Sequence, residues 1–120
     1  MGDSHKDLIA WRKAMIFVRE IYGMTRLFPK DELYGFTTQL RRAAVSIPSN
    51  IAEGQARFSP KEFCHFLSHA RGSLVEIETQ ILIAQDLGYI SSSQSKMLLQ
   101  QAVELGRVLN GLIASIKKAA

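Results

Sequence analysis

Apolar residues recur every three or four positions along most of the chain, which is the pattern of amphipathic helices. In residues 8–27 this stripe consists of Leu8, Trp11, Met15, Val18, Tyr22 and Thr25. We expect this helix to end at Phe28-Pro29, because a residue before proline avoids the helical region. A second helix is predicted after Asp31, which we expect to cap it, with a stripe at Leu33, Phe36, Leu40, Ala44, Ile47 and Ile51.

Pro48 lies inside the stripe of the second helix. Proline removes one helical hydrogen bond and clashes with the carbonyl group one turn earlier. The apolar period nevertheless continues in phase through Ile51. We therefore predict one long helix that is kinked at Pro48, and Gly54 offers a place for it to stop.

Capping patterns mark the two remaining helices. Ser59-Pro60-Lys61-Glu62 combines a capping serine, a first-turn proline and a capping-box glutamate. The helix that follows carries an apolar face of Phe63, Phe66, Leu67, Ala70, Leu74, Ile77, Ile81 and Ala84. After Gly88, Ser91 and Gln94 stand at capping-box spacing before a heptad stripe of Leu98, Ala102, Leu105, Leu109, Leu112 and Ile116.

Four amphipathic helices joined by short turns predict an all-α fold, an antiparallel up-and-down four-helix bundle. We assign it to residues 8–118 as a single domain, with residues 1–7 as a mobile N-terminus. Several apolar residues lie off the stripes: Ile9, Ile16, Phe17, Met24, Val75, Leu82, Ile83, Leu99 and Val103. A helix with more than one apolar face is buried on more than one side, which favours self-association, with Ile16 and Phe17 in assembly or partner docking. A wide stripe in a small bundle is the alternative.

Composition narrows the class of protein. A chain of 120 residues, 47% of them apolar, fits one globular domain. The single cysteine excludes an intramolecular disulfide framework and a cysteine-based zinc finger. The apolar runs are too short to cross a membrane and the N-terminus has no signal-peptide core, so we expect a cytoplasmic protein.

Basic residues exceed acidic ones by a small margin. Fifteen Lys and Arg against eleven Asp and Glu give a net charge of +4. This excess is compatible with binding to nucleic acid, although a solvated surface of mixed charge explains it equally well. The candidate phosphate-contacting residues are Arg12, Lys13, Arg19 and Arg26 of the first helix and Arg41 of the second, which we expect to face away from the apolar stripe.

Polar stripes flank the apolar faces of the second and third helices. If these helices are antiparallel neighbours, Arg42 and Arg57 would find partners among Glu53, Glu62 and Glu76. We therefore expect a structural polar network, which sets the register of the helices and consists of Arg42, Ser46, Asn50, Glu53 and Glu76. A ligand pocket within the bundle is the alternative.

No pattern points to catalysis. Glu62, His65 and His69 resemble half of a di-metal bundle site, which needs a second Glu-x-x-His that the chain lacks. We expect surface histidines and no metal or cofactor, with a metal or small-molecule site at these three residues as an alternative. Cys64 and His65 are sequence neighbours and point about 100° apart on a helix, so they form no nucleophilic pair. Without a phosphate loop or a nucleophile elbow, no catalytic residue is assigned and the protein is predicted not to be an enzyme.

The segment from Gln39 to Gly54, QLRRAAVSIPSNIAEG, resembles the signature of bacterial four-helix-bundle proteins first recognised in 23S rRNA intervening sequences. Phe28-Pro29, the segment ELYG at 32–35, ARGSL at 70–74 and LGYI at 87–90 agree with it, and the resemblance extends over residues 7–118. The resemblance implies a homopentamer with a central channel. The family is also similar to accessory proteins of diversity-generating retroelements, which are basic pentamers that bind nucleic acid and a reverse transcriptase.

These observations lead to two hypotheses about function. The first is a non-enzymatic homo-oligomer that binds RNA or DNA through its basic surface residues. The alternative is a protein-interaction scaffold, such as a partner of a reverse transcriptase, that does not itself bind nucleic acid. The sequence leaves the type of nucleic acid, any protein partner and the physiological role open.

Overall fold

In the computed structural model, residue 5 and residues 8–119 are described, and they form four long helices. These are α1 (Ile9–Thr25), α2 (Phe36–Gln55), α3 (Pro60–Asp86) and α4 (Ser92–Ala119), with a short 3-10 helix, η2 (Lys30–Glu32), between α1 and α2. The described residues include no strand, which confirms the all-α prediction. Except for His5, the expected mobile N-terminus lies outside the described residues.

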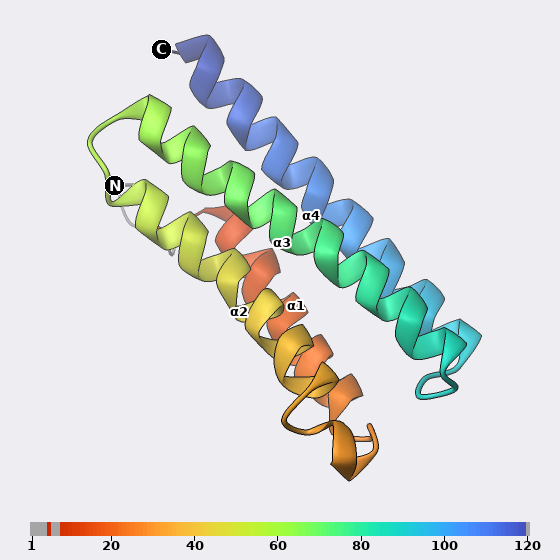
Figure 1. Cartoon of the computed structure of the whole chain (residues 1–120). Helices are drawn as coiled ribbons and strands as arrows, with labels where there is room; N and C mark the ends of the chain where they lie inside the picture. The colour runs from red at the N-terminus through yellow and green to blue at the C-terminus, as the bar shows by residue number, and fades with distance from the viewer. Residues whose placement is uncertain (1–4, 6–7, 120) are drawn as a thin grey trace.

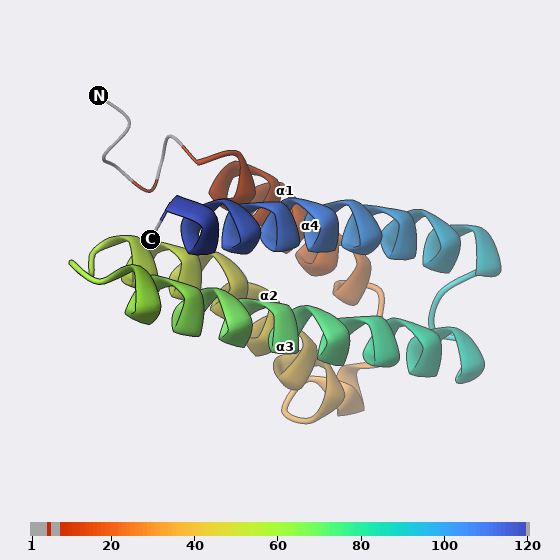
Figure 2. The ribbon, with the colours of Figure 1, turned by 90° about the horizontal axis from the view of Figure 1, so that it is seen from above.

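Successive helices reverse direction and lie side by side (Figure 1). Viewed from above, α4 lies beside α1 and α3 lies beside α2 (Figure 2). Each helix packs against two neighbours in a closed ring, most extensively between α2 and α3 and least between α1 and α4. The bundle measures 46 × 24 × 22 Å. This arrangement confirms the antiparallel up-and-down four-helix bundle.

The helix starts follow local capping chemistry. The Ser59 hydroxyl accepts a hydrogen bond from the backbone N–H of Glu62 at 3.2 Å. At the start of α4, the Gln94 N–H donates to the Ser91 hydroxyl at 3.1 Å and the Ser91 N–H donates to Gln94 Oε1 at 2.9 Å, a reciprocal capping box. Both predicted starts are confirmed. The prediction that Asp31 caps the second helix is wrong, because Asp31 lies within η2 and α2 begins at Phe36, after Gly35.

The helix α2 continues through Pro48 without interruption, as the unbroken apolar period predicted. Side chains satisfy several backbone carbonyl groups around the proline. Ser46 Oγ donates to the Ala43 carbonyl at 2.8 Å, Ser49 Oγ to Val45 at 2.9 Å and Asn50 Nδ2 to Ser46 at 2.8 Å. The kink at Pro48 stays a prediction.

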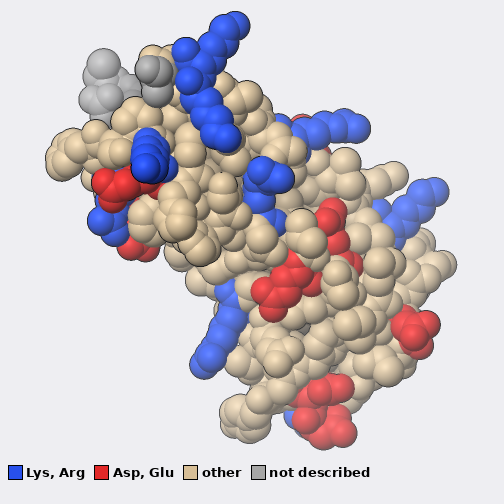
Figure 3. Space-filling model, turned by 45° about the horizontal axis from the view of Figure 1, so that its top comes forward, with Lys and Arg blue, Asp and Glu red and all other residues tan. Residues whose placement is uncertain are grey.

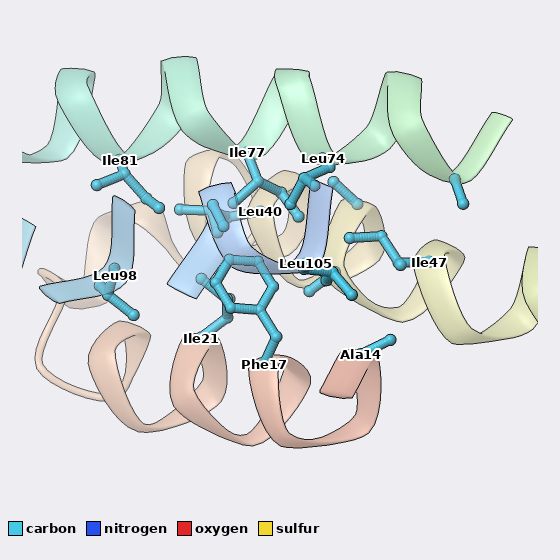
Figure 4. Close-up of a cluster of buried hydrophobic side chains, with 14 of the residues drawn as sticks. Ala14, Phe17, Ile21, Leu40, Ile47, Leu74, Ile77, Ile81, Leu98 and Leu105 are labelled. Atoms are coloured by element: carbon cyan, nitrogen blue, oxygen red, sulfur yellow. The ribbon is translucent and has the colours of Figure 1, made fainter. Parts of the chain in front are cut away.

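The core lies along the bundle axis, where inward-facing side chains from all four helices meet (Figure 4). The predicted apolar stripes of α2, α3 and α4 supply most of it, with Leu40, Ile77 and Leu105 almost fully buried. In α1, however, the buried residues are Ala10, Ala14, Phe17, Ile21, Met24 and Thr25, and only Thr25 of these belongs to the predicted stripe. The predicted α1 stripe is therefore misplaced by one residue, or about 100°, and most of it is only half-buried. Phe17 is 2% exposed, so the expectation that it docks a partner is wrong, whereas Ile16 is 50% exposed.

Candidate nucleic-acid interface

Three arginines form a row along the solvent face of α1. Arg12, Arg19 and Arg26 are all exposed and stand seven residues apart, with Arg26 immediately after the end of α1. Seven residues rotate a helix by nearly two full turns, so the three side chains leave on one face. At 1.5 Å per residue they are about 10 Å apart along the axis. We call Arg12, Arg19 and Arg26 the arginine row. Arg19 and Arg26 form no ion pair with any described residue.

Lys13, the fourth candidate on α1, lies toward α4. Its Nζ is 3.8 Å from Glu104 Oε2, and both side chains are about half-exposed, at 41% and 52%. An exposed pair of this kind contributes at most about 1 kcal/mol to stability. Lys13 therefore lies off the face of the arginine row, and its charge is partly balanced by the neighbouring helix.

Arg41, the fifth candidate, is held against α1. Its Nε donates a hydrogen bond to Thr25 Oγ1 at 2.8 Å, and its guanidinium group lies 4.6 Å from the centre of the Tyr22 ring. Thr25 is buried, and its hydroxyl lies 2.8 Å from the Ile21 carbonyl, to which it donates. Arg41 is outside the apolar stripe of α2, but it is half-buried, because it lies in the groove between α1 and α2.

A shallow hollow opens between α1 and α2 beside Arg41. Its lining consists of Tyr22, Thr38, Arg41, Arg42, Val45 and Ser46. Arg42 is exposed here and forms no ion pair within the described residues. Tyr22 is three residues from Arg19 and four from Arg26, so the hollow borders the arginine row on the surface of α1.

The polar residues expected to form one network occupy separate places. Ser46 Oγ meets Ser73 Oγ of α3 at 2.5 Å, and Asn50 binds the Ser46 carbonyl. Glu53 pairs instead with Arg57, whose other nitrogen reaches Glu62; the distances are 3.2 and 3.7 Å. Glu76 accepts from Gln80 of its own helix at 3.3 Å, and Arg42 stands apart in the hollow. Two separate contacts therefore link α2 and α3, the serine pair and the ion pairs of Arg57 with Glu53 and Glu62, and only Arg57 of the two arginines pairs with the expected glutamates.

His65 and His69 lie on the exposed face of α3, with their Nε2 atoms 3.2 Å apart. Among the described residues, no three His, Cys, Asp or Glu side chains gather closely enough to hold a metal ion. Charge on this side of the molecule is mixed: Figure 3 shows basic side chains concentrated over the end with the C-terminus and acidic ones toward the opposite end.

Comparison with known proteins places the chain in a family. The model of the 23S rRNA-intervening sequence protein family matches residues 6–111. The chain belongs to this family. The family recognised from residues 39–54 is therefore confirmed.

A solved structure supports the fold of this family member. It is a protein of unknown function from the S23 ribosomal protein family of Bacteroides thetaiotaomicron, with a TM-score of 0.80 and 22% identity, and the match covers 88% of this chain and 98% of that one. The comparison with curated proteins gave no match. Neither the family description nor that of the solved structure names a catalytic activity. Within the described part of the chain, no helix is both long and apolar enough to span a membrane.

Sequence reasoning named Arg41 but not the residues that position it. Thr25 was assigned to the apolar stripe of the first helix, and Tyr22 was assigned to the same stripe. In the structure both face α2 and hold the guanidinium group. A threonine in an otherwise apolar stripe was the available signal, since a buried hydroxyl needs a hydrogen-bond partner.

Proposed function

We propose that this family member is a non-enzymatic nucleic-acid-binding protein that acts as a cytoplasmic homo-oligomer. The observation that carries the proposal is the arginine row on one exposed face of α1, with Arg41 and Arg42 in the adjoining hollow. Five guanidinium groups on one side of a small bundle suit a string of phosphate groups. Contacts of this type release counterions and are largely insensitive to base sequence.

Exposed apolar side chains support assembly. Ile16 of α1 and Met97 of α4 line a groove between these helices, which share the least extensive contact of the neighbouring pairs. Val75 and Leu82 of α3 and Val103 of α4 are also about half-exposed or more. The family resemblance implies a pentamer, and five copies of a chain with charge +4 carry about +20. Several weak phosphate-binding surfaces in one assembly then act together by avidity.

A salt series on RNA binding tests this function. The affinity of the protein for a labelled oligouridylate would be measured by fluorescence anisotropy at increasing salt concentration. The double variant Arg19→Gln and Arg26→Gln should bind more weakly and lower the salt slope by roughly 1.4, because each lost contact to a single strand removes about 0.7.

The double variant Lys117→Gln and Lys118→Gln is the matched control, since it removes the same charge at the end of α4. It should keep the wild-type salt slope. Failure of the wild-type protein to bind at low salt would overturn the proposal. Equal losses in the two double variants would show that binding follows net charge and not the arginine row.

A protein-interaction scaffold, for example a partner of a reverse transcriptase, is the second candidate. Phe58, in the loop between α2 and α3, and Tyr34, between η2 and α2, are almost completely exposed at 105% and 94%. Aromatic side chains of this kind are frequent anchors in protein interfaces. A defined partner that remains bound after nuclease treatment, and that Phe58→Ala releases, would favour the scaffold.

A further inference from the structure

The hollow between α1 and α2 contains a guanidinium group whose orientation is fixed before any ligand arrives. Arg41 is held at two points, by the hydrogen bond from its Nε to Thr25 Oγ1 and by the face of the Tyr22 ring. Thr25 is itself fixed, because it is buried and its hydroxyl donates to the Ile21 carbonyl. These contacts occupy Nε and one face of the guanidinium plane, and they leave the two terminal nitrogens for another partner.

Of the three hydroxyl groups that line the hollow, those of Thr38 and Ser46 are already committed, and the third is that of Tyr22. The Thr38 hydroxyl donates to the Leu33 carbonyl, and the Ser46 hydroxyl donates to the Ala43 carbonyl. No Asp or Glu lines the hollow, and neither Arg41 nor Arg42 is within ion-pair distance of a described carboxylate. The available donors are therefore mainly the N–H groups of two arginines. A group that only accepts hydrogen bonds and carries negative charge suits them.

We propose that this hollow is a phosphate-binding pocket, in which Arg41 makes an oriented contact and Arg42 a second one. Adjacent residues on a helix point about 100° apart, so the two guanidinium groups approach a ligand from different directions. A tetrahedral phosphate presents oxygens in several directions and can meet both, whereas a planar carboxylate matches one guanidinium fork. The inference rests on the proposed function for its natural ligand, a phosphodiester of RNA or DNA.

The pocket and the arginine row differ in whether lysine can replace arginine. A purely electrostatic contact depends on charge and tolerates lysine in place of arginine. An oriented guanidinium contact requires the planar fork and the groups that hold it, so lysine does not replace it. Arg41 is thus proposed as a binding residue and Thr25 as a positioning residue.

Charge-conserving variants test the pocket. Arg41→Lys and Thr25→Val each keep the net charge, and Thr25→Val keeps the shape of the buried side chain. Both should weaken binding to a labelled oligouridylate by about tenfold, the value of one charge-assisted hydrogen bond, and leave the salt slope unchanged. Arg19→Lys in the arginine row is the matched control and should bind like the wild type. Circular dichroism checks folding, and Arg41→Lys decides the test if Thr25→Val does not fold.

A second measurement separates the pocket from the proposed function. In NMR spectra of the arginine side chains, added inorganic phosphate should shift the Arg41 Nε–H signal, and the shift should reach a plateau as the site saturates. Chloride at equal ionic strength should not shift this signal. If the wild type fails to bind RNA but phosphate shifts this signal, the pocket stands and the nucleic-acid function falls. If RNA binds with the expected salt slope and both variants bind like the wild type, the pocket is wrong and the function stands.

Discussion

Gly54 of α2 lies against α3, and of the glycines in the described chain it is the one with the least room for a Cβ atom. A Cβ atom on Gly54 would lie 2.8 Å from Phe66 Cβ and 2.9 Å from Phe63 Cδ1, and 3.3 Å from the Phe63 carbonyl oxygen. All three atoms belong to α3. The Phe66 Cβ is fixed to its backbone, so a rotamer change cannot move it. Relief of the contact in Gly54→Ala requires the two helices to separate.

Two opposing effects set the magnitude. Overpacking a close contact costs typically about 1–3 kcal/mol. Alanine in place of glycine within a helix returns about 1 kcal/mol. The net expectation for Gly54→Ala is a loss of up to about 2 kcal/mol in the free energy of unfolding, which is about 1–3 kcal/mol less stable than a glycine-to-alanine change without the close contact. In a chain of this size, a loss of about 2 kcal/mol corresponds to a fall in Tm of about 8 °C.

Gly72→Ala in α3 and Gly111→Ala in α4 are matched controls, because a Cβ atom at either position meets nothing within 4 Å. Both should raise the free energy of unfolding by up to about 1 kcal/mol. Urea unfolding followed by far-UV circular dichroism, at one protein concentration for all variants, measures the three values. If Gly54→Ala were as stable as Gly72→Ala, the close approach of α2 and α3 would be refuted.

Two further predictions concern the end of the bundle and the face of α1. Tyr89 Oη donates to Glu32 Oε2 at 2.7 Å, and this bond raises the pKa of Tyr89 above its usual value of 10.0. The stabilisation from this bond is therefore present below about pH 10 and is lost as the pH rises through the raised pKa. In thermal melts, the wild type should be more stable than Tyr89→Phe at neutral pH, and this difference should disappear in strong alkali. A difference that stayed constant with pH would contradict the prediction. Phe17→Ala should lower the free energy of unfolding by about 3–5 kcal/mol, whereas Ile16→Ala should lower it by less than about 1 kcal/mol, because only Phe17 is buried. Urea titrations measure both values, and equal losses would contradict the observed buried face of α1.

The apolar faces of α3 and α4 were predictable because their largest apolar residues recur at a regular spacing of three and four, and because capping residues fix where each helix starts. The face of α1 was not. Two adjacent stripes of this helix are apolar, one with large residues such as Trp11 and Tyr22, the other with Ala10 and Ala14 beside Phe17. Because α1 packs against both α2 and α4, the buried arc lies between these neighbours, and small alanines occupy the tight positions. The large side chains such as Trp11 and Tyr22 gave the stronger periodic pattern in the sequence, but they lie at the edge of the buried face and are only half-buried.

The candidate site divides in the same way. Exposed cations such as Arg19 could be assigned from helix periodicity, because their position depends on their own helix alone. The setting of Arg41 depends on Thr25, which lies in another helix and reaches it only when the chain has turned through η2. Arg57 forms ion pairs with Glu53 and Glu62, two of the glutamates that the helix spacing predicted, whereas Arg42 forms none within the described residues. Contacts across a turn of unknown geometry lie beyond what spacing can predict.

The segment from Gln39 to Gly54 contains residues that pack the bundle and residues that lie at its surface, and the two kinds are on different faces of α2. Gly54 permits the close approach of α3, and Ser46 links α2 to Ser73. Leu40 and Ile47 fill the core, while Arg41 is held against α1. Arg42 is different, because it is exposed and no described carboxylate pairs with it. Packing therefore gives no reason for a guanidinium group at this position. An anionic ligand shared with Arg41 supplies one, and Arg42→Gln should accordingly weaken phosphate binding with little change in the stability of the bundle.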